Sequence, residues 1–202
     1  MLLAIDTSAG TSVAVVDSDA RVLAECSSDD PRGHAETIGS LIRDAIAGAG
    51  VRVSDLGAVA AGMGPGPFTG LRVGIAAARA FAVGAGIPVL PVLSHDAIAR
   101  RSGVRAVVAT DARRRELFVS VYDGLDDAGL PVRVSGPSIV PVTELDVPAE
   151  RTLVQATTVS AGALGAVAVI QRIVGRPFAA DAAVYLRSPD VTLSAGPKRV
   201  TS

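Results

Sequence analysis

The stretch GPGPFTGLRVG, residues 64–74, joins a segment that reads as a buried strand, residues 57–63, to one that reads as a helix, residues 69–83. Glycine adopts backbone angles that strain other residues, proline fixes φ, and Thr69 is a candidate N-cap for the helix. The stretch therefore predicts a rigid loop leading from a strand into a helix. The free backbone N–H groups at such a helix start can bind an anion, or the loop can simply seat the helix tightly.

Apolar patterns on either side of this loop predict an α/β fold. Residues 2–5, 11–17 and 21–26 read as three antiparallel strands, residues 34–47 as an amphipathic helix, and residues 87–93 as a further strand. The resulting order βββαβαβ indicates a sheet of mixed direction.

The second half of the chain is expected to form a smaller unit. A polar break at residues 100–103 predicts a first lobe over residues 1–101 and a reduced second lobe over residues 102–202, whose tail can pack back on the first. Residues 129–148, rich in Pro and Gly, read as an irregular connection. The other predicted elements are strands at 105–110, 116–122 and 153–156, a helix at 161–174, and a closing strand or tail at 185–187.

The composition argues against a protein that binds nucleic acid unaided. The 202 residues carry a net charge of −1, and Arg113, Arg114 and Arg115 form the only tight basic cluster. This cluster is either a solvated hairpin turn or a contact for tRNA or a partner. Hydrophobic residues make up 49% of the chain and charged residues 19%, so either a partner covers part of the surface or the enrichment in Ala, Val and Gly explains the figure.

Two rare residue types exclude several kinds of site. Cys26 is the only cysteine, which excludes an internal disulfide and a cysteine-based zinc site and fits a reducing compartment. The only lysine, Lys198, lies near the C-terminus, so the body of the fold has no lysine for a Walker-type phosphate loop or a Schiff base. No signal-type segment opens the chain, and we expect a cytoplasmic protein that does not enter a membrane.

The turn Asp6-Thr7-Ser8 between the first two predicted strands is the main candidate for chemistry. Actin-like and sugar-kinase-like ATPases keep an Asp and small residues at this position, facing a nucleotide phosphate. Asp and Ser are also ordinary hairpin residues, so a plain turn is the competing interpretation.

The histidines do not form a paired metal site. Four residues after His34 stands Ile38, and four after His95 stands Ala99, whereas a helical pair needs ligands at i and i+4. No nucleophile-elbow sequence marks any serine for a Ser-His-Asp arrangement. We therefore expect no metal ion in this chain.

The helix predicted at residues 69–83 is apolar on nearly every face, with Arg72 and Arg79 as the exceptions. A helix of this kind must be covered on two sides. One side packs on its own sheet, and the small flank formed by Gly70, Gly74 and Ala77 or Ala78 lets another helix approach closely, within the fold or from a second subunit.

Five motifs in this order resemble the TsaB (YeaZ) family, the small actin-like relatives of TsaD. They are Ile5–Ser8 with Ser12–Ala14, His34–Glu36, Gly64–Gly74, Asp111–Arg114 with Glu116, and Tyr185–Arg187. The chain departs from the family pattern at Pro67, where Ser is usual, and at residues 155–158, which replace a Gly-Asp-Gly-like element.

The resemblance implies an actin-like, ribonuclease-H-like fold with two lobes of mixed sheets flanked by helices. It also implies a non-catalytic subunit that pairs with TsaD and recruits TsaE, in a complex that forms threonylcarbamoyladenosine at position 37 of tRNAs reading ANN codons. Bound ATP or ADP and metal are then expected in the partner subunits, tRNA contact only through the complex, and a homodimer in isolation. The iron site of TsaD needs His-x-x-x-His, and residues 95–99 here keep only the first His.

By the same resemblance, the first two helices carry the partner interface and Asp6, Thr7 and Ser8 are a vestigial phosphate turn. The expected interface residues are His34, Glu36, Ile38, Leu41, Phe68, Gly70, Leu71, Arg72, Gly74, Ile75, Ala78 and Arg79. The competing functions are a weak nucleotide-binding or nucleotide-hydrolysing protein of the actin-like class and a homologue of M22-type peptidases.

Overall fold

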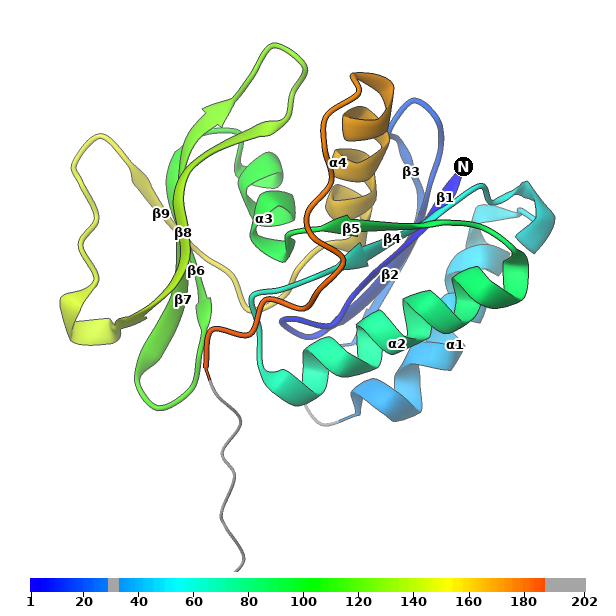
Figure 1. Cartoon of the computed structure of the whole chain (residues 1–202), viewed down its shortest axis with the longest axis horizontal. Coiled ribbons are helices and arrows are strands. Elements are labelled where there is room, and N and C mark those ends of the chain that lie inside the picture. Colours follow the sequence, from blue (N-terminus) through cyan, green and yellow to red (C-terminus); the bar gives the residue numbers. More distant parts are fainter. Residues whose placement is uncertain (29–32, 188–202) are drawn as a thin grey trace, which may run out of the picture.

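Two β-sheets organise the chain, whose computed structural model describes residues 1–28 and 33–187 (Figure 1). Lys198 lies outside the described residues. The first sheet has five strands in the order β3-β2-β1-β4-β5, and the second has four in the order β8-β7-β6-β9. The first-sheet strands are β1 (Leu2–Asp6), β2 (Thr11–Val16), β3 (Val22–Ser28), β4 (Val59–Gly62) and β5 (Val89–Val92). The second-sheet strands are β6 (Arg105–Asp111), β7 (Glu116–Leu125), β8 (Pro131–Pro141) and β9 (Thr152–Gln155).

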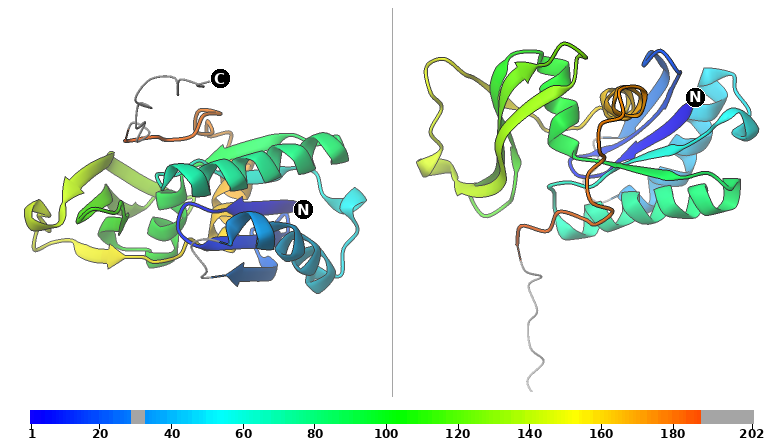
Figure 2. Two further views of the ribbon diagram at one scale, coloured as in Figure 1. Left: turned by 90° about the horizontal axis from the view of Figure 1, so that it is seen from below. Right: turned by 45° about the horizontal axis from the view of Figure 1, so that its top comes forward.

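Helices cover both faces of the first sheet. On one face lie α1 (His34–Ala49) and α2 (Phe68–Ala85), and on the other lies α4 (Ala161–Ile173), as Figure 2 shows. β1 and β2 are buried along their whole length, because apolar side chains on both of their faces meet a helix layer. We call this sheet with α1, α2 and α4 the first lobe.

The second sheet is packed on one face by α3 (Ser94–Ser102), which also contacts α4. We call this sheet with α3 the second lobe. Its other face forms a small cluster of Val107, Ala109, Leu117 and Val119, which the chain between β8 and β9 partly covers. α3 and α4 thus form the layer that joins the lobes (Figure 1).

The predicted mixed α/β fold and the order βββαβαβ are confirmed. Both predicted helices of the first half are present, and each ends at a left-handed glycine, Gly50 at φ 67° and Gly86 at φ 66°. The N-cap position of α2 is Pro67 and not Thr69, which lies inside the first turn. The chain direction at this junction is therefore set by proline and glycine geometry without a side-chain cap.

The predictions were wrong at two places, the polar break at residues 100–103 and the connection at residues 129–148. The helix α3 was not predicted, because residues at its start and end are polar. Its buried side is formed by residues 94, 95 and 97–99. Only Gly103, its left-handed C-cap at φ 69°, matches the predicted break. Residues 131–141, read as part of an irregular connection, form strand β8, which tolerates its prolines because it lies at the edge of the sheet.

The helix α4 belongs in space with the first sheet, although it comes from the second half of the chain. The segment after it also returns to the first lobe, where Ala183 packs in the core under α1 and α2. It forms no regular strand at residues 185–187. The division at residue 101 remains a prediction, but the contacts show that the chain crosses between the lobes more than once.

Within the described ranges, α2 alone is long and apolar enough to cross a membrane by length and composition. A core helix passes the same test, and α2 packs its apolar face on the first sheet.

Candidate functional site at two facing hairpins

The motifs singled out in the sequence gather around one cleft between the lobes. The cleft has a volume of about 240 Å³ and is formed by the β1–β2 turn, the β6–β7 turn, the start of α1 and the chain after β9. Its lining residues are Thr7, Ser8, Ala9, Gly10, His34, Pro67, Asp111, Arg113, Gln155, Ala156 and Thr157.

The β1–β2 turn is buried, and its carboxylate is used internally. Asp6 is 1% exposed and does not line the cleft. Its Oδ1 accepts hydrogen bonds from the Ser8 N–H at 2.8 Å and the Ser8 hydroxyl at 2.6 Å, and its Oδ2 accepts one from the Ser94 hydroxyl at 2.5 Å. Burial raises the pKa of Asp6, and these hydrogen bonds oppose the rise. Both oxygens of the Asp6 carboxylate are therefore bonded within the chain.

Thr7 fastens this turn to the first turns of α2. Its hydroxyl donates to the Gly70 carbonyl at 2.6 Å and accepts from the Gly74 N–H at 3.0 Å. A Cβ atom at Gly70 would lie 2.6 Å from the Thr7 carbonyl oxygen, and one at Gly74 would overlap the Thr7 hydroxyl. The small flank of α2, expected to admit a second helix, is therefore occupied by the β1–β2 turn of the same chain.

Consecutive residues at the start of α3 connect the two lobes. Ser94 bonds to Asp6 in the first lobe, and His95 bonds to the second through Ser120 Oγ at 2.8 Å and Thr110 Oγ1 at 2.9 Å. Burial, with a smaller contribution from the charge of Arg133, lowers the pKa of His95 to about 3. His95 is therefore a neutral structural residue that fixes α3 to the second sheet.

The β6–β7 turn is the exposed counterpart. Arg113, Arg114 and Arg115 adopt left-handed backbone angles, with φ of 63°, 55° and 61°, and all are exposed. The Arg113 N–H donates to Asp111 Oδ1 at 2.8 Å, which stabilises the start of the turn. Arg113 is the only one of these arginines that lines the cleft. Among the described residues, no three His, Cys, Asp or Glu side chains come together as a metal-binding group.

The expected partner residues divide into an inner and an outer set. The inner residues are buried in the core of this chain, where they hold α1 and α2 on the sheet; they are Ile38, Gly70, Leu71, Gly74, Ile75 and Ala78. The outer residues are half-buried or exposed; they are His34, Glu36, Leu41, Phe68, Arg72 and Arg79. Only the outer set is accessible to a partner, and His34 Nδ1 also shares a hydrogen bond of 2.6 Å with Thr11 Oγ1.

A groove of about 600 Å³ runs between α2 and the segment after α4, and sequence reasoning missed its second wall. The Tyr185 ring packs on Phe68 with centroids 4.9 Å apart, and the Arg72 guanidinium lies 4.2 Å from the centroid of Phe68. Further along, Arg79 forms an ion pair with Asp181 at 2.8 Å. Residues 185–187 carried part of the family resemblance, but no local pattern places them beside α2 more than a hundred residues earlier.

The two sheets, each with an antiparallel hairpin at the cleft, define an actin-like, ribonuclease-H-like α/β protein. The family model of TsaD, tRNA N6-adenosine threonylcarbamoyltransferase, matches residues 23–169. An uncharacterized protein of Mycobacterium tuberculosis strain H37Rv is 42% identical over 148 residues, covering 72% of this chain and 67% of that protein.

Named relatives narrow the group. The tRNA threonylcarbamoyladenosine biosynthesis protein TsaB of Escherichia coli is 33% identical over 129 residues, covering 60% of this chain and 54% of its own length. The structure of YeaZ from Pseudomonas aeruginosa superimposes with a TM-score of 0.76 at 27% identity, covering 92% of this chain and 99% of that one. The chain therefore belongs to the TsaD-related family and, within it, to the TsaB/YeaZ group.

Proposed function

We propose that this protein is a non-catalytic subunit that pairs with a TsaD-like transferase and supports formation of threonylcarbamoyladenosine at position 37 of tRNAs that read ANN codons. A TsaE-like ATPase is the third component, and ATP or ADP and metal bind in the partner subunits. Free of its partner, the chain forms a homodimer through the same helices. The proposal places the protein in the cytoplasm with its tRNA substrates, which it meets through the complex.

The observation that carries the proposal is the internal use of Asp6. In an active actin-like ATPase the Asp of the first hairpin faces the nucleotide, whereas here both of its oxygens accept hydrogen bonds from Ser8 and Ser94. The first hairpin therefore supports the fold and leaves the chemistry to another subunit.

The surface of α2 supports the pairing role. Arg72 is exposed and stacks on Phe68, so a ring holds its guanidinium in place. An arginine positioned in this way loses little side-chain entropy when it binds a carboxylate. Together with the rings of Phe68 and Tyr185, it forms the mixed aromatic and arginine surface that is common at interface centres.

The test uses the full chain and the TsaD-like protein of the same genome. A double variant, Phe68→Ala with Arg72→Glu, is expected to weaken their complex at least about tenfold in titration calorimetry, because it removes the stacked pair and reverses a charge. Arg172→Glu, an exposed charge reversal on α4 across the first sheet, is the matched control and should bind as the parent does. In cells, the double variant should lower the fraction of modified tRNA measured by mass spectrometry. Unchanged binding together with unchanged modification in a deletion strain contradicts the proposal.

A second candidate function, nucleotide binding by the isolated chain, is favoured by one observation. Arg113 and His34 line the cleft together with the backbone of residues 8–10, a set of donors that could receive a phosphate if Asp111, which also lines the cleft, gives up its ion pair with Arg113. Calorimetry with ATP and Mg²⁺ separates the candidates. Tight binding that Arg113→Ala weakens favours a nucleotide site, and absence of heat favours the partner role. The burial of Asp6 predicts the second result.

A further inference from the structure

Residues 176–187, the segment that follows α4, pass across the edge of the first sheet and along α2 (Figures 1 and 2). The Ala179 N–H donates to the Pro91 carbonyl of β5 at 3.1 Å, and the Val184 N–H donates to the Met63 carbonyl at 2.8 Å. Ala183 packs among the core residues of the first lobe. The middle of the segment is therefore fixed to the first lobe by backbone bonds and burial.

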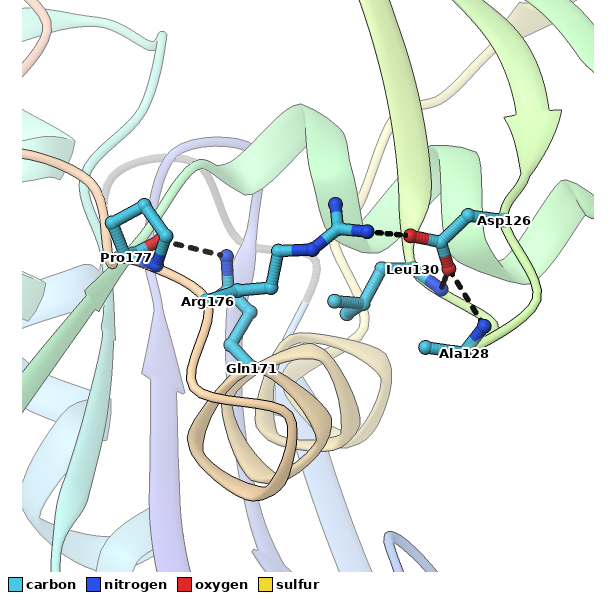
Figure 3. A network of polar contacts seen from close by, with 6 residues as sticks. All are labelled: Asp126, Ala128, Leu130, Gln171, Arg176 and Pro177. Carbon is cyan, nitrogen blue, oxygen red and sulfur yellow. Dashed lines mark hydrogen bonds and ion pairs between the residues drawn. The ribbon is translucent and has the colours of Figure 1, made fainter.

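One end of the segment holds the β7–β8 turn of the second lobe (Figure 3). Arg176 forms an ion pair with Asp126 Oδ2 at 2.6 Å, while Asp126 Oδ1 accepts from the backbone N–H groups of Ala128 and Leu130 at 3.0 and 2.9 Å. The Gln171 side chain donates to the Pro177 carbonyl at 3.4 Å, which ties the segment to the last turn of α4. These bonds connect α4 to the turn through one arginine.

The other end holds the β6–β7 turn at the cleft. Arg187 forms an ion pair with Glu116 and donates to the Ala112 carbonyl at 3.1 Å. Glu116 is the first residue of β7, and Asp126 comes directly after its last residue. The two ends of the segment therefore bind the two ends of strand β7 in the second sheet.

We infer that residues 176–187 form a latch that sets the opening between the two lobes and so the separation of the two hairpins that line the cleft. The buried Ser94–Asp6 contact at the start of α3 joins the lobes on the inside, where His95 fixes α3 to the second sheet, and the latch joins the lobes on the outside. The layer formed by α3 and α4 joins the lobes on one side, and attachments at both ends of β7 restrain rotation about that layer. This inference does not depend on the proposed function.

The latch is built from partly exposed pairs, which are weak enough to open. The Arg187 and Glu116 side chains are 29% and 32% exposed, and those of Arg176 and Asp126 are 54% and 18% exposed. Solvent and salt screen such pairs. Tyr185 lies two residues before Arg187 and contacts Phe68, so a molecule bound in the α2 groove would touch the latch directly.

The experiment measures the distance between the lobes. In a Cys26→Ser background, spin labels at Ala47→Cys on α1 and Thr143→Cys after β8, both exposed positions, report the opening by double electron–electron resonance. The parent is expected to give one narrow distribution. The latch variant, Arg176→Ala with Arg187→Ala, is expected to give a broader one with an added longer distance. Amide exchange at residues 111–116 should accelerate on the order of fivefold.

Three further variants decide between a latch and a general loss of stability. The single variant Arg187→Ala should broaden the distance distribution. Exchanging the charges, Arg187→Glu with Glu116→Arg, should restore an ion pair and give a narrower distance distribution than Arg187→Ala does. Arg52→Ala, which breaks an ion pair with Asp55 inside the first lobe, should leave it unchanged. The inference is overturned if the folded latch variant keeps the parent distribution, or if Arg52→Ala broadens it equally.

Discussion

The two hairpins at the cleft have the same topology and opposite surroundings. The β1–β2 turn is buried, its polar groups are bonded within the chain, and glycines of α2 make room for it. The β6–β7 turn is exposed, carries a row of arginines in left-handed conformation, and is held from outside by Arg187. The β1–β2 turn is thus buried because its polar groups are hydrogen-bonded within the chain, whereas the β6–β7 turn leaves its charged side chains in solvent.

The difference bears on function because only the second hairpin offers unburied charge to the cleft. Asp6 lies in the position that the fold class reserves for nucleotide chemistry, but its bonds to Ser8 and Ser94 turn it into a structural group. Arg113 also lines the cleft, but its guanidinium is exposed and lies 3.7 Å from the Asp111 carboxylate beside it in the same turn. The four predictions that follow test how firmly each hairpin is held.

The largest effect is expected where α2 seats the first hairpin. Gly74→Ala places a methyl group against the Thr7 hydroxyl and should destabilise the protein by about 3 kcal/mol. Gly84→Ala is the same substitution in the same helix, with nothing within 4 Å of the new atom, and should stabilise by about 0.5–1 kcal/mol. Denaturant unfolding measures both. Equal effects would show that Thr7 is not in contact with α2.

His95 tests the link to the second hairpin through pH. Because its folded pKa of about 3 lies below 6.5, the unfolded chain takes up a proton that the folded chain refuses, and stability falls as pH drops below 6.5. Its contribution amounts to about 2 kcal/mol lost between pH 6.5 and 5. The variant His95→Gln should lack this loss. Between pH 7 and 8 its free energy of unfolding should change with pH in the same way as that of the parent.

The raised pKa values of Asp6 and Asp96 act in the opposite direction. Each folded carboxyl holds its proton to a higher pH than the unfolded one, so each adds stability as pH falls toward 3.8. Both proteins contain Asp6 and Asp96, so these contributions cancel when the free energy of unfolding of His95→Gln is subtracted from that of the parent at each pH. A pH-independent difference would contradict a buried neutral His95.

Ser94→Ala removes one hydrogen-bond donor from the buried carboxylate of Asp6 and should cost about 1–2 kcal/mol. Ser102→Ala, at the other end of α3, loses a half-buried hydroxyl that donates to the Ala99 carbonyl of the same helix, and should change stability by less than about 0.5 kcal/mol. Thermal unfolding of the two variants compares them. A neutral Ser94→Ala would mean that Asp6 needs no partner from α3.

The smallest effect is expected at the exposed turn. Arg115→Gly relieves a left-handed backbone at φ 61° and should stabilise by up to about 1 kcal/mol, less the added entropy of glycine in the unfolded chain. Gly10→Ala makes the reverse change in the first hairpin, at φ 69°, and should destabilise by about 1 kcal/mol or more. Chemical denaturation measures the change in unfolding free energy of each variant. Changes of opposite sign support the contrast between the two hairpins, and changes of equal sign contradict it.

Much of the first half of the fold could be predicted because its signals are local. Alternating and continuous apolar runs mark β1, β2 and β4, and the glycines at residues 50 and 86 mark helix ends. α3 escaped prediction because its buried side includes Ser94 and His95, whose burial is possible only with partners on β1, β6 and β7. β8 escaped because edge strands admit the Pro and Gly residues that elsewhere indicate loops.

By itself, the stretch at residues 64–74 determined that a strand passes through a rigid loop into an apolar helix, because proline and glycine restrict or free the backbone locally. Only the tertiary structure decided what its glycines are for. Gly74 leaves room for the Thr7 side chain, 67 residues earlier in the chain, and donates a hydrogen bond to its hydroxyl. The second wall of the α2 groove comes from residues beyond 180. Backbone angles are local properties of a sequence, whereas burial depends on which distant segments meet.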